Sequence, residues 1–512
     1  MPETTLAEPA LGTRPQTEAP VASQPSPKPA EHEPEPDPIY DVMVIGAGSG
    51  GLSVALPLHE FGLKVLLIDK TDQAIGGDCL NDGCVPSKAL IHVARQVQQA
   101  REATRFGLQV QGEVDMALVT KFVHERQDII RKHENAGYFR RKGIDVALGT
   151  ARFVGQDVVE VAGIRYRGRK IVIATGSRPR RLSIPGSDKV NYLTNQSLFD
   201  LQQLPKNLLV VGGGPIGIEM AQAFRRLGAK VTVVHKKENI LDKEAEEISR
   251  ILLQRLEAEG IRFFLESETL RFADDRHLVV KTKDQEEVML TFDQVLVSIG
   301  RELNTEQLDL NKAGIDPDDH GIKVNDYLQT TNKQVYVCGD IAGSLLFSHA
   351  AEQQASVLLN NFLSPFKKKL DNKHMSWVTF TDPEVATFGY REEQLKEKNL
   401  PYEKISTGFG EDDRAVVEEY QYGRLVLYIE KTSLLNWNPK VLGGSMIAPH
   451  AGEMIQELVL ANTHKLGINA FFNKIYAYPT GSTINKRLVM KKKQQFLTPL
   501  VKKLLQLLYK IG

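Results

Sequence analysis

A strand, a glycine-rich turn, a helix and a second strand follow one another twice in this sequence, about 166 residues apart. The first copy has apolar strands at residues 40–45 and 65–68. The second has strands at residues 208–211 and 231–234, joined through a helix at residues 216–227. This order of elements is typical of a parallel βαβ unit. The repeat therefore predicts an α/β protein with two nucleotide-binding domains.

The first turn reads Gly46-Ala47-Gly48-Ser49-Gly50-Gly51. Gly46 permits the tight turn, Gly48 lets the backbone approach a pyrophosphate, and Gly51 lets the helix pack on the strand. The free amides and positive dipole end of the helix face the phosphates. Asp69 ends the second strand, where an acid binds ribose hydroxyls. We expect a dinucleotide here rather than an empty turn, and we expect Pro57 to kink the helix or end it early.

The second turn has glycine at the same three positions: Gly212, Gly214 and Gly217. The strand after its helix ends in His235-Lys236-Lys237 instead of an acid. A carboxylate favours NAD, whereas cations neutralise a 2′-phosphate. The sequence therefore favours NADPH, with NADH as the alternative if both lysines are solvated surface charges.

The cysteine count, the net charge and the lack of long apolar runs exclude several classes of site and partner. Three cysteines exclude a disulfide scaffold, a four-thiolate zinc site and an iron–sulfur cluster held by Cys alone. With 64 basic and 64 acidic residues the formal net charge is zero, which gives no electrostatic footprint for nucleic acid. The sequence has no run of 18 apolar residues, so we expect no membrane-spanning helix. A length of 512 residues predicts about three domains.

Cys79 and Cys84 follow the first βαβ unit and have four residues between them. A short helical turn at this spacing brings two thiols within disulfide distance. Pro86 suits the first turn of the next helix, so Cys84 lies near its positive end, and Lys88 adds positive charge; both lower a thiol pKa. We interpret the pair as redox-active, with two buried small residues or part of a zinc site as alternatives. Cys338, on an apolar strand, is interpreted as a core residue.

Together these features resemble the class I pyridine nucleotide-disulfide oxidoreductases, the flavoenzyme family of dihydrolipoamide dehydrogenase, glutathione reductase and mercuric reductase. The likeness runs from about residue 39 to 487. It is carried by the two-cysteine segment and by the runs Ala174-Thr175-Gly176, Gly300-Arg301, Cys338-Gly339-Asp340, Thr381-Asp382-Pro383-Glu384 and Gly443-Gly444. The resemblance implies two Rossmann-like domains, for FAD and NAD(P)H, and a C-terminal α+β domain that builds a homodimer.

The resemblance also implies roles for individual residues. Cys84 is the flavin-proximal thiol, and Cys79 faces the substrate. Lys88 lies beside the flavin and pairs with Glu219. Further cofactor-binding positions are Thr175, Gly176, Gly300, Gly339 and Asp340, of which Asp340 holds the FAD ribityl chain. Electrons then pass from NADPH through FAD to the cysteine pair.

One segment departs from the disulfide reductases of the family, which carry His-Pro-Thr and a Glu three residues beyond. This sequence has Tyr478-Pro479-Thr480, and Thr483 stands in place of the Glu. A phenol with a pKa near 10 is only about 0.1% ionised at pH 7. Loss of a proton-transfer group typically costs about 10²–10⁴-fold in rate. Efficient turnover of lipoamide or glutathione disulfide is therefore disfavoured.

Mercuric reductase resembles this arrangement, with a Tyr at the corresponding place, and Asp413-Arg414-Ala415 is similar to segments of its relatives. A soft metal ion bound transiently by Cys79 and Cys84 suits the change, because no leaving thiolate needs a proton. The sequence has no C-terminal Cys pair and no N-terminal metal-binding domain with Cys, so it is similar to a mercuric reductase-like protein. The alternatives are a disulfide reductase and a flavin-loaded scaffold with little turnover.

The expected organisation places three domains between two tails. Residues 1–38 hold ten prolines and seven acids against two bases, which is typical of disorder and lacks a secretory signal, so we expect a cytoplasmic protein. The FAD-binding domain comprises 39–190 and 303–372, the NAD(P)H-binding domain 191–302, and the dimerisation domain 373–487. Residues 488–512 form a basic amphipathic tail. Its segment 491–512 is expected to contact either a membrane surface or the protein itself.

Overall fold

The structure is a computed structural model that describes residues 37–318, 321–343, 345–432, 436–495 and 497–511. The tail expected at residues 1–38 lies outside the described residues, apart from its last two positions.

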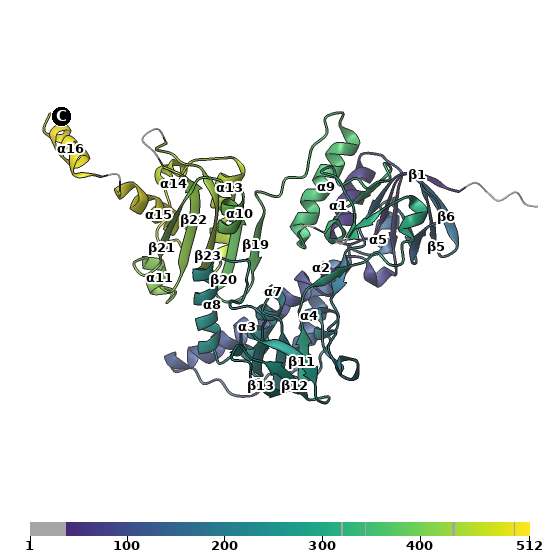
Figure 1. The fold of residues 1–512 in the computed structure, drawn as a ribbon, viewed down its shortest axis with the longest axis horizontal. Coiled ribbons are helices and arrows are strands. Elements are labelled where there is room, and N and C mark those ends of the chain that lie inside the picture. Colours follow the sequence, from purple (N-terminus) through teal and green to yellow (C-terminus); the bar gives the residue numbers. More distant parts are fainter. Residues whose placement is uncertain (1–36, 319–320, 344, 433–435, 496, 512) are drawn as a thin grey trace, which may run out of the picture. The chain divides into compact units, whose positions relative to one another are not determined.

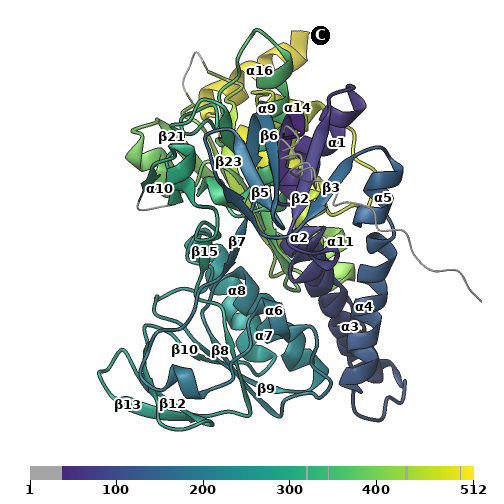
Figure 2. The same cartoon turned by 90° about the vertical axis from the view of Figure 1, so that its right-hand side faces the viewer.

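The first domain is built on a sheet with strand order β3-β2-β1-β6-β5-β4, in which β1 pairs in parallel with both β2 and β6. The late strand β18 also joins this sheet, in parallel with β6. Helices α1 and α9 pack together (Figure 1), and α3 runs beside α4 (Figure 2). The elements are β1 (Ile39–Ile45), α1 (Ser49–Glu60), β2 (Val65–Asp69), α2 (Gly77–Asn81), α3 (Cys84–Glu102), α4 (Met116–Arg131), α5 (Ala136–Arg141), β3 (Asp145–Leu148), β4 (Ala151–Phe153), β5 (Val158–Val161), β6 (Ile164–Ile173), β18 (Val335–Val337) and α9 (Ser348–Leu363).

Of the two outcomes expected at Pro57, a kink or an early end, the early end is wrong, because α1 continues to Glu60. Proline removes its own N–H donor and crowds the carbonyl four residues earlier, but it keeps its own carbonyl as an acceptor. The carbonyl of Pro57 still accepts a hydrogen bond from the Phe61 amide at 3.0 Å, so the last turn is closed.

The second domain repeats the parallel arrangement with strand order β10-β9-β8-β14. A three-stranded antiparallel sheet, β11-β12-β13, lies between β10 and β14 in chain order. The elements are α6 (Asn195–Leu198), β8 (Asn207–Val211), α7 (Pro215–Leu227), β9 (Lys230–Val234), α8 (Glu246–Ala258), β10 (Arg262–Phe264), β11 (Glu268–Phe272), β12 (His277–Lys281), β13 (Glu287–Thr291) and β14 (Gln294–Val297).

The third domain has a five-stranded antiparallel sheet with strand order β19-β20-β23-β22-β21 and helices packed on it (Figure 1). The elements are β19 (Ser376–Thr379), β20 (Glu384–Gly389), α10 (Glu392–Glu397), β21 (Tyr402–Gly408), α11 (Asp413–Val417), β22 (Arg424–Glu430), β23 (Val441–Ala448), α12 (Ala451–Met454), α13 (Gln456–Thr463), α14 (Asn469–Asn473), α15 (Thr483–Gln494) and α16 (Pro499–Ile511).

Short elements complete the described chain. Two small antiparallel pairs, β7 with β15 and β16 with β17, connect the larger sheets. Their bounds, with those of the 3₁₀ turns, are β7 (Ser177–Pro179), β15 (Arg301–Leu303), β16 (Pro317–Asp318), β17 (Gly321–Ile322), η1 (Asp72–Ala74), η2 (Ala103–Phe106), η3 (Ser187–Lys189), η4 (Leu310–Ala313) and η5 (Asp340–Ala342).

One buried apolar cluster joins all three domains. It includes Leu90 of α3, Phe224 of α7, and Val385 and Ile447 of the C-terminal sheet, each at most 1% exposed. Burial of such side chains stabilises by about 1.5–3 kcal/mol each, so the domain junctions are part of the core. The expected α/β class, with two Rossmann-like domains and a C-terminal α+β domain, is confirmed.

Candidate active site at the junction of the two dinucleotide-binding units

The first glycine-rich turn needs glycine at positions that touch backbone. Gly46 has φ +106°, and a Cβ there would lie 2.3 Å from the carbonyl oxygen of Ala174. A Cβ on Gly51 would lie 1.8 Å from the carbonyl oxygen of Gly46. The turn is held from β2, where the Asp69 carboxylate accepts a hydrogen bond from the Ala47 amide at 2.7 Å. Burial raises the pKa of Asp69, although its two backbone hydrogen bonds lower it.

The start of α1 suits an anion. Its N-cap is Gly48, which has no side chain to cap the first-turn amides, and the first turn contains no acid. Free amides and the positive end of the helix dipole favour a phosphate at this position. The turn also lies close to α2, because a Cβ on Gly48 would be in van der Waals contact, at 3.4 Å, with the Cα of Gly77.

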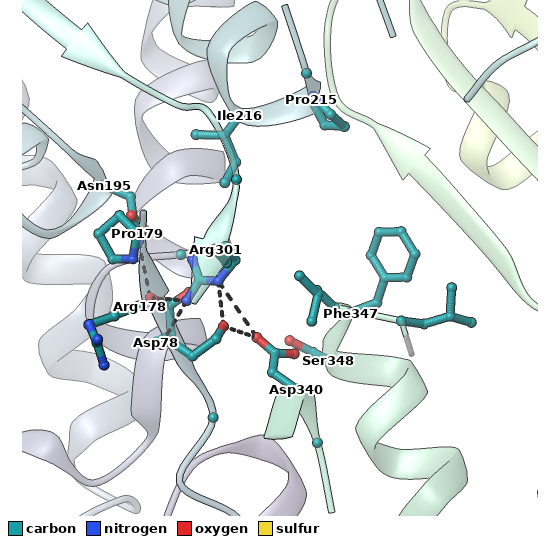
Figure 3. A pocket seen from close by; sticks show the side chains of 18 of the residues that line it. Asp78, Arg178, Pro179, Asn195, Pro215, Ile216, Arg301, Asp340, Phe347 and Ser348 are labelled. Atoms are coloured by element: carbon teal, nitrogen blue, oxygen red, sulfur yellow. Dashed lines mark hydrogen bonds and ion pairs between the residues drawn. The ribbon is translucent and has the colours of Figure 1, made fainter. Parts of the chain in front are cut away.

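A cluster of two carboxylates and a guanidinium lines the same cavity as this turn. Arg301 is 3.2 Å from Asp78 and 3.6 Å from Asp340, as Figure 3 shows. Ser177 donates a hydrogen bond to Asp340 at 2.5 Å and accepts one from Arg301 at 2.6 Å. Burial raises the pKa of Asp340, while Ser177 and Arg301 lower it. The cluster holds Asp340 in a fixed orientation toward the cavity.

The remaining predicted cofactor positions, from the first domain and from the end of the second, line the same cavity. Thr175 and Asn304 exchange hydrogen bonds of 2.8 Å, each from a side chain to a backbone carbonyl. Gly176, Gly300 and Gly339 all have positive φ, at +66°, +119° and +86°. The amide of Gly339 donates to the Gln354 side chain at 2.7 Å.

The second glycine-rich turn has a similar backbone, but a different side chain accepts the hydrogen bond from its amide. Gly212 has φ +117°, and a Cβ on Gly217 would lie 2.2 Å from the carbonyl oxygen of Gly212. Here Nδ1 of His235 accepts a hydrogen bond from the Gly213 amide at 3.1 Å. Burial lowers the pKa of His235, which keeps the imidazole neutral and able to accept. Helix α7 begins after Gly214, again without a side-chain cap.

Lys236 and Lys237 follow His235 at the carboxyl end of β9. Both are exposed and line the same cavity as the second turn. Their ammonium groups are therefore available to an anionic ligand, whereas His235 is engaged with the turn.

The thiol pair lies at the start of α3. Cys79 is in α2, Cys84 is the first residue of α3, and both are free thiols. The pKa of Cys84 is lowered to about 6, chiefly by a hydrogen bond from Cys79 and further by Ser348 and Lys88, against the opposing effect of burial. Its Sγ is 3.7 Å from the Ser348 hydroxyl of α9. The pKa of Cys79 is raised, first by the same hydrogen bond. The arrangement is a thiolate at Cys84 beside a protonated Cys79.

Lys88 lies one turn after Cys84 and connects the thiol pair to the second domain. Its Nζ is 3.0 Å from the Glu219 carboxylate and 4.5 Å from the centre of the Phe380 ring. Glu219 is 5% exposed, and its other oxygen accepts from the Phe380 amide at 2.8 Å. The carboxylate is thus satisfied on both sides, which a buried charge requires.

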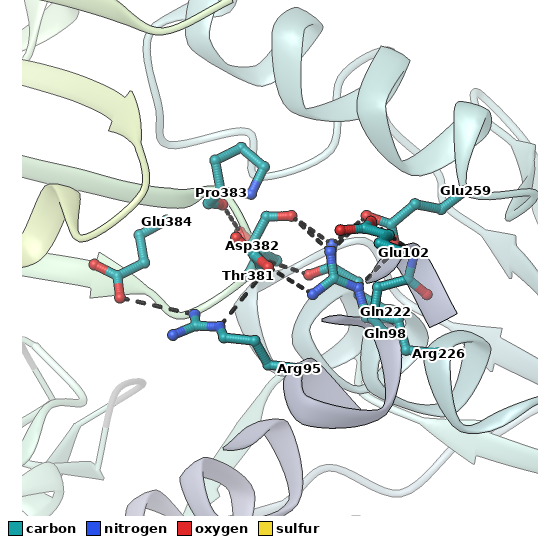
Figure 4. Close-up of polar contacts among 10 residues, drawn as sticks. All are labelled: Arg95, Gln98, Glu102, Gln222, Arg226, Glu259, Thr381, Asp382, Pro383 and Glu384. Atoms are coloured by element: carbon teal, nitrogen blue, oxygen red, sulfur yellow. Dashed lines mark hydrogen bonds and ion pairs between the residues drawn. The ribbon is translucent and has the colours of Figure 1, made fainter. Parts of the chain in front are cut away.

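Helix α7 holds the loop between β19 and β20 with three side chains, of which Figure 4 shows Gln222 and Arg226. Besides Glu219, Gln222 exchanges hydrogen bonds with the backbone of Asp382 at 2.7 and 2.8 Å. Arg226 reaches the Asp382 carboxylate at 2.7 Å and binds both oxygens of Glu259 at 2.8 and 2.9 Å. The helix that starts at the second glycine turn therefore fixes the C-terminal domain.

A cavity of about 2670 Å³ unites these parts. Sites for single drug-sized ligands measure about 300–1,000 Å³, so its volume suits two dinucleotides. Both cysteines, Lys88 and Glu219 line it. So do the predicted cofactor positions Gly46, Gly48, Asp69, Thr175, Gly176, Gly212, Gly214, His235, Lys236, Lys237, Gly300, Gly339 and Asp340. Gly51 and Gly217 lie behind the turns instead, at the contacts between helix and strand.

Tyr478 lies outside the cavity lined by its own chain. Its side chain is 78% exposed, and its hydroxyl donates to Asp413 at 3.0 Å. That hydrogen bond raises the pKa of Tyr478, so the phenol is a still weaker base at neutral pH. Thr483 donates to Asp412 at 3.2 Å and supplies no carboxylate.

Sequence reasoning missed several side chains that shape the site. Asp78 and Asp82 lie between or beside the cysteines, and the pKa of Asp82 is raised to about 7, mainly by burial and then by the charges of Asp78 and Asp200. Their sequence position was visible, but their role depends on Arg301, which lies far away in the chain. Ser348 had no sequence signal, because 264 residues separate it from Cys84.

The residues fit the two nucleotides that the sequence implied. Each cleft has a glycine cradle in which a Cβ would collide with backbone, an uncapped helix start for phosphate, and a polar residue after the second strand. Within the described ranges, no group of three or more His, Cys, Asp or Glu residues is placed to hold a metal ion. The site can bind two dinucleotides and can carry an electron pair as a thiol pair or a disulfide.

Comparison with known proteins agrees with this chemistry. A profile described as pyridine nucleotide-disulphide oxidoreductase matches residues 40–355, and one described as the dimerisation domain of such proteins matches residues 375–488. The chain is 31% identical to a mercuric reductase of Lysinibacillus sphaericus, over 86% of this chain and 80% of that protein. It is 32% identical to a dihydrolipoyl dehydrogenase of Chlamydia trachomatis, over 86% and 94% respectively.

A solved structure shares the fold across most of both chains. It is the Cu(II) complex of the HOCl-induced flavoprotein disulfide reductase RclA from Escherichia coli, with a TM-score of 0.78 and 25% sequence identity. The match covers 88% of this chain and 98% of that one.

Proposed function

The chain belongs to the class I pyridine nucleotide-disulfide oxidoreductases, and from this premise we propose which electrons it moves and where they go. It is a FAD-dependent NAD(P)H oxidoreductase that passes electrons through Cys79 and Cys84 to a soft metal ion such as Hg²⁺, or to another small thiol-reactive oxidant. The observation that carries the proposal is the pairing of a low-pKa thiol, Cys84, with a Tyr478 that cannot act as a base at neutral pH.

Residues of this chain hold the cofactors at their two turns. The Gly46–Gly51 turn, Asp69 and Asp340 hold FAD, and the Gly212–Gly217 turn holds the nicotinamide nucleotide. Bound FAD supplies the relay of an electron pair between the nicotinamide and the cysteine pair. Lys88, fixed by Glu219, keeps positive charge beside Cys84 and stabilises its thiolate.

The cysteine pair accepts the two electrons by opening its S–S bond, which leaves a thiolate at Cys84 and a thiol at Cys79. A soft metal ion favours thiolate ligands, and binding it displaces the Cys79 proton to solvent. The electron pair then passes to the metal, Hg⁰ leaves, and the S–S bond between Cys79 and Cys84 forms again. The electron balance closes as NADPH + Hg²⁺ → NADP⁺ + H⁺ + Hg⁰. Since no thiol product leaves, this reaction needs no proton donor at the position of Tyr478.

NADPH is proposed as the electron donor. Lys236 and Lys237 are exposed at the cavity wall, where two cations favour a 2′-phosphate. A ratio of kcat/KM that favours NADH tenfold would reject this part of the proposal.

A homodimer is proposed as the working form, since residues 375–488 match a dimerisation domain. In that arrangement we propose that Tyr478 of one subunit serves the thiol pair of the other; its exposed position outside its own chain's cavity leaves it available for this contact. Tyr478 then acts as a ligand-positioning hydroxyl and not as a base.

Activity on the metal tests the main proposal. NADPH oxidation by the full-length flavoprotein is measured with Hg²⁺ in excess thiol, and the proposal expects turnover that Cys79→Ala and Cys84→Ser abolish. Cys338→Ser is the matched control, since this thiol is fully buried in the core. NADPH oxidation that does not depend on metal or on either site cysteine would exclude the proposed function.

The second candidate is a disulfide reductase of the dihydrolipoamide dehydrogenase or glutathione reductase type. It is favoured by relatives named dihydrolipoyl dehydrogenase and by the description of RclA as a disulfide reductase. Tyr478 and Thr483 weigh against it. If Tyr478→His with Thr483→Glu creates lipoamide turnover in a parent that has none, the parent is not such an enzyme.

A further inference from the structure

The C-terminal end of the chain differs in charge from the rest. From residue 458 to 512 the sequence has ten basic residues and no acid, while the whole chain balances 64 against 64. The remainder therefore carries a net charge of 54 − 64 = −10. The ten bases are Lys465, Lys474, Lys486, Arg487, Lys491, Lys492, Lys493, Lys502, Lys503 and Lys510.

Part of this segment belongs to the C-terminal domain. Ile484, Leu488 and Val489 of α15 are at most 2% exposed in its core. Lys492 is also buried and is bonded to Glu403 of β21. Residues up to about 495 are therefore used by the fold, although the sequence alone suggested that the tail begins at residue 488.

Helix α16 is different, because it buries none of its side chains. Six apolar side chains are each at least half exposed: Leu500 (77%), Leu504 (55%), Leu505 (50%), Leu507 (55%), Leu508 (56%) and Ile511 (75%). On a helix of 3.6 residues per turn these positions share one face, and Lys502, Gln506 and Lys510 share the opposite one. A contiguous exposed apolar face of this kind marks an interaction site.

Length and charge identify the surface that this face suits. Thirteen residues extend about 20 Å, which is shorter than the roughly 30 Å hydrocarbon core of a bilayer. Among the described helices, none has the length and apolar character needed to cross a membrane. A helix with an apolar face and a lysine face lies in the plane of a lipid interface, and its lysines favour anionic headgroups.

A second copy of the same segment is the main competing occupant. Two α16 helices packed through their apolar faces would bury leucines but gain no ion pairs, because residues 458–512 contain no Asp or Glu side chain to offset their ten positive charges. Like charges at close range oppose such packing. Charge therefore favours an anionic lipid surface over self-association.

We propose that α16 attaches this protein to anionic lipid surfaces, with Leu504 and Leu508 inserted among the acyl chains and Lys502, Lys503 and Lys510 at the headgroups. This attachment is independent of the redox chemistry and of the identity of the electron acceptor.

Vesicle flotation of the full-length flavoprotein tests the proposal. Vesicles contain phosphatidylcholine alone or with phosphatidylglycerol. We expect flotation only with the anionic vesicles, and at least a tenfold weaker partition coefficient for Leu504→Asp with Leu508→Asp. The matched control, Gln506→Asp with Tyr509→Asp, adds the same charge outside the apolar face and retains more binding. Truncation after Gln495 abolishes flotation.

Light scattering without vesicles distinguishes a lipid surface from a second copy of the chain as the partner of the apolar face of α16. The proposal expects the same oligomeric state for the parent and for Leu504→Asp with Leu508→Asp. Flotation that is equal on both vesicle types, or unchanged by truncation, overturns the proposal. So does dissociation of the oligomer by the double variant, which would assign the face to a contact between copies.

Discussion

The two glycine-rich turns share a backbone but are held by chemically different side chains. In the first, the Asp69 carboxylate accepts the Ala47 amide at 2.7 Å; in the second, the neutral His235 imidazole accepts the Gly213 amide at 3.1 Å. Both devices satisfy one buried backbone donor, which the turn requires. Only the first acceptor, Asp69, is an anion at the expected ribose position. In the second turn the acceptor is neutral, and the charged side chains at the end of the strand are Lys236 and Lys237. One fold is thereby suited to two different nucleotides.

The helices that follow the turns also differ. Helix α1 packs within its own domain against α9, and it carries no charged residue in its first turn. Helix α7 instead binds the C-terminal domain through Glu219, Gln222 and Arg226. The first unit provides the surface for chemistry, and the second connects the domains and fixes Lys88. Four changes test this division, from the largest expected effect to the smallest.

Arg226→Ala should give the largest effect, because it removes the cation between Glu259 and Asp382. Arg226 is 8% exposed, and loss of one member of a buried ion pair costs about 3–5 kcal/mol. We expect a clear fall in Tm by scanning calorimetry. Arg250→Ala is the matched control, since its pair with Glu246 on α8 is exposed and contributes about 0.3–0.5 kcal/mol. An equal fall in both variants would contradict the role assigned to α7.

Lys236→Glu with Lys237→Glu should reverse the charge at the second nucleotide edge. Replacing two cations with two anions near a 2′-phosphate is expected to lower kcat/KM for NADPH by about 10²-fold. The value for NADH should change far less, since NADH lacks that phosphate. Steady-state kinetics with both nucleotides measure the ratio. A parallel loss for both would show that the lysines do not distinguish them.

Asp69→Ala and His235→Ala compare directly the two side chains that accept a hydrogen bond from the turn amides. Each change leaves a turn amide unpaired, Ala47 in the first turn and Gly213 in the second. A hydrogen bond to a charged acceptor contributes about 1.5–3 kcal/mol and a neutral one about 0.5–1.5 kcal/mol, so the larger loss is expected for Asp69→Ala. We expect Asp69→Ala to weaken FAD retention, measured by flavin fluorescence on dilution. His235→Ala should leave the flavin in place and raise KM for NADPH. The opposite pattern would mean that the turns are assigned to the wrong nucleotides.

The smallest expected effect is a shift in the pH at which the Cys84 thiol loses its proton. Its pKa of about 6 means that thiolate and alkylation rate rise as pH increases through about 6 and stay high above it. Cys79→Ala removes the largest stabilising cause and should raise that midpoint, and Lys88→Met should raise it less. Glu219→Gln unmasks the Lys88 charge and should lower it. Iodoacetamide rates against pH, resolved by peptide mass, measure all four proteins; a midpoint that ignores these changes would contradict the account.

The sequence was sufficient for elements whose information is local. Spacing of glycines and apolar residues placed β1 and β2, and also β8, α7 and β9, within one or two residues. The expected early end at Pro57 is wrong, because the last turn of α1, which packs against α9, still closes through the Pro57 carbonyl. The pairing of Lys88 with Glu219 came from family resemblance, since 131 residues separate them and no local rule connects them.

Interactions between distant segments were beyond sequence reasoning. The Ser348 hydroxyl near Cys84, the Arg301 cluster around Asp78 and Asp340, and the Arg226 network all depend on how three domains meet. Charge composition identified the basic C-terminal segment, but only burial distinguished Lys492, which is bonded within the domain, from the exposed face of α16.

An anaerobic titration with NADPH tests the central claim most directly, because it reports whether the Cys84 thiolate lies against the flavin. The account predicts a long-wavelength thiolate-to-flavin charge-transfer absorption after one equivalent of NADPH, absent in Cys84→Ser and retained in Cys338→Ser. Flavin that bleaches directly, with no such absorption and no difference between the parent and Cys84→Ser, would contradict it.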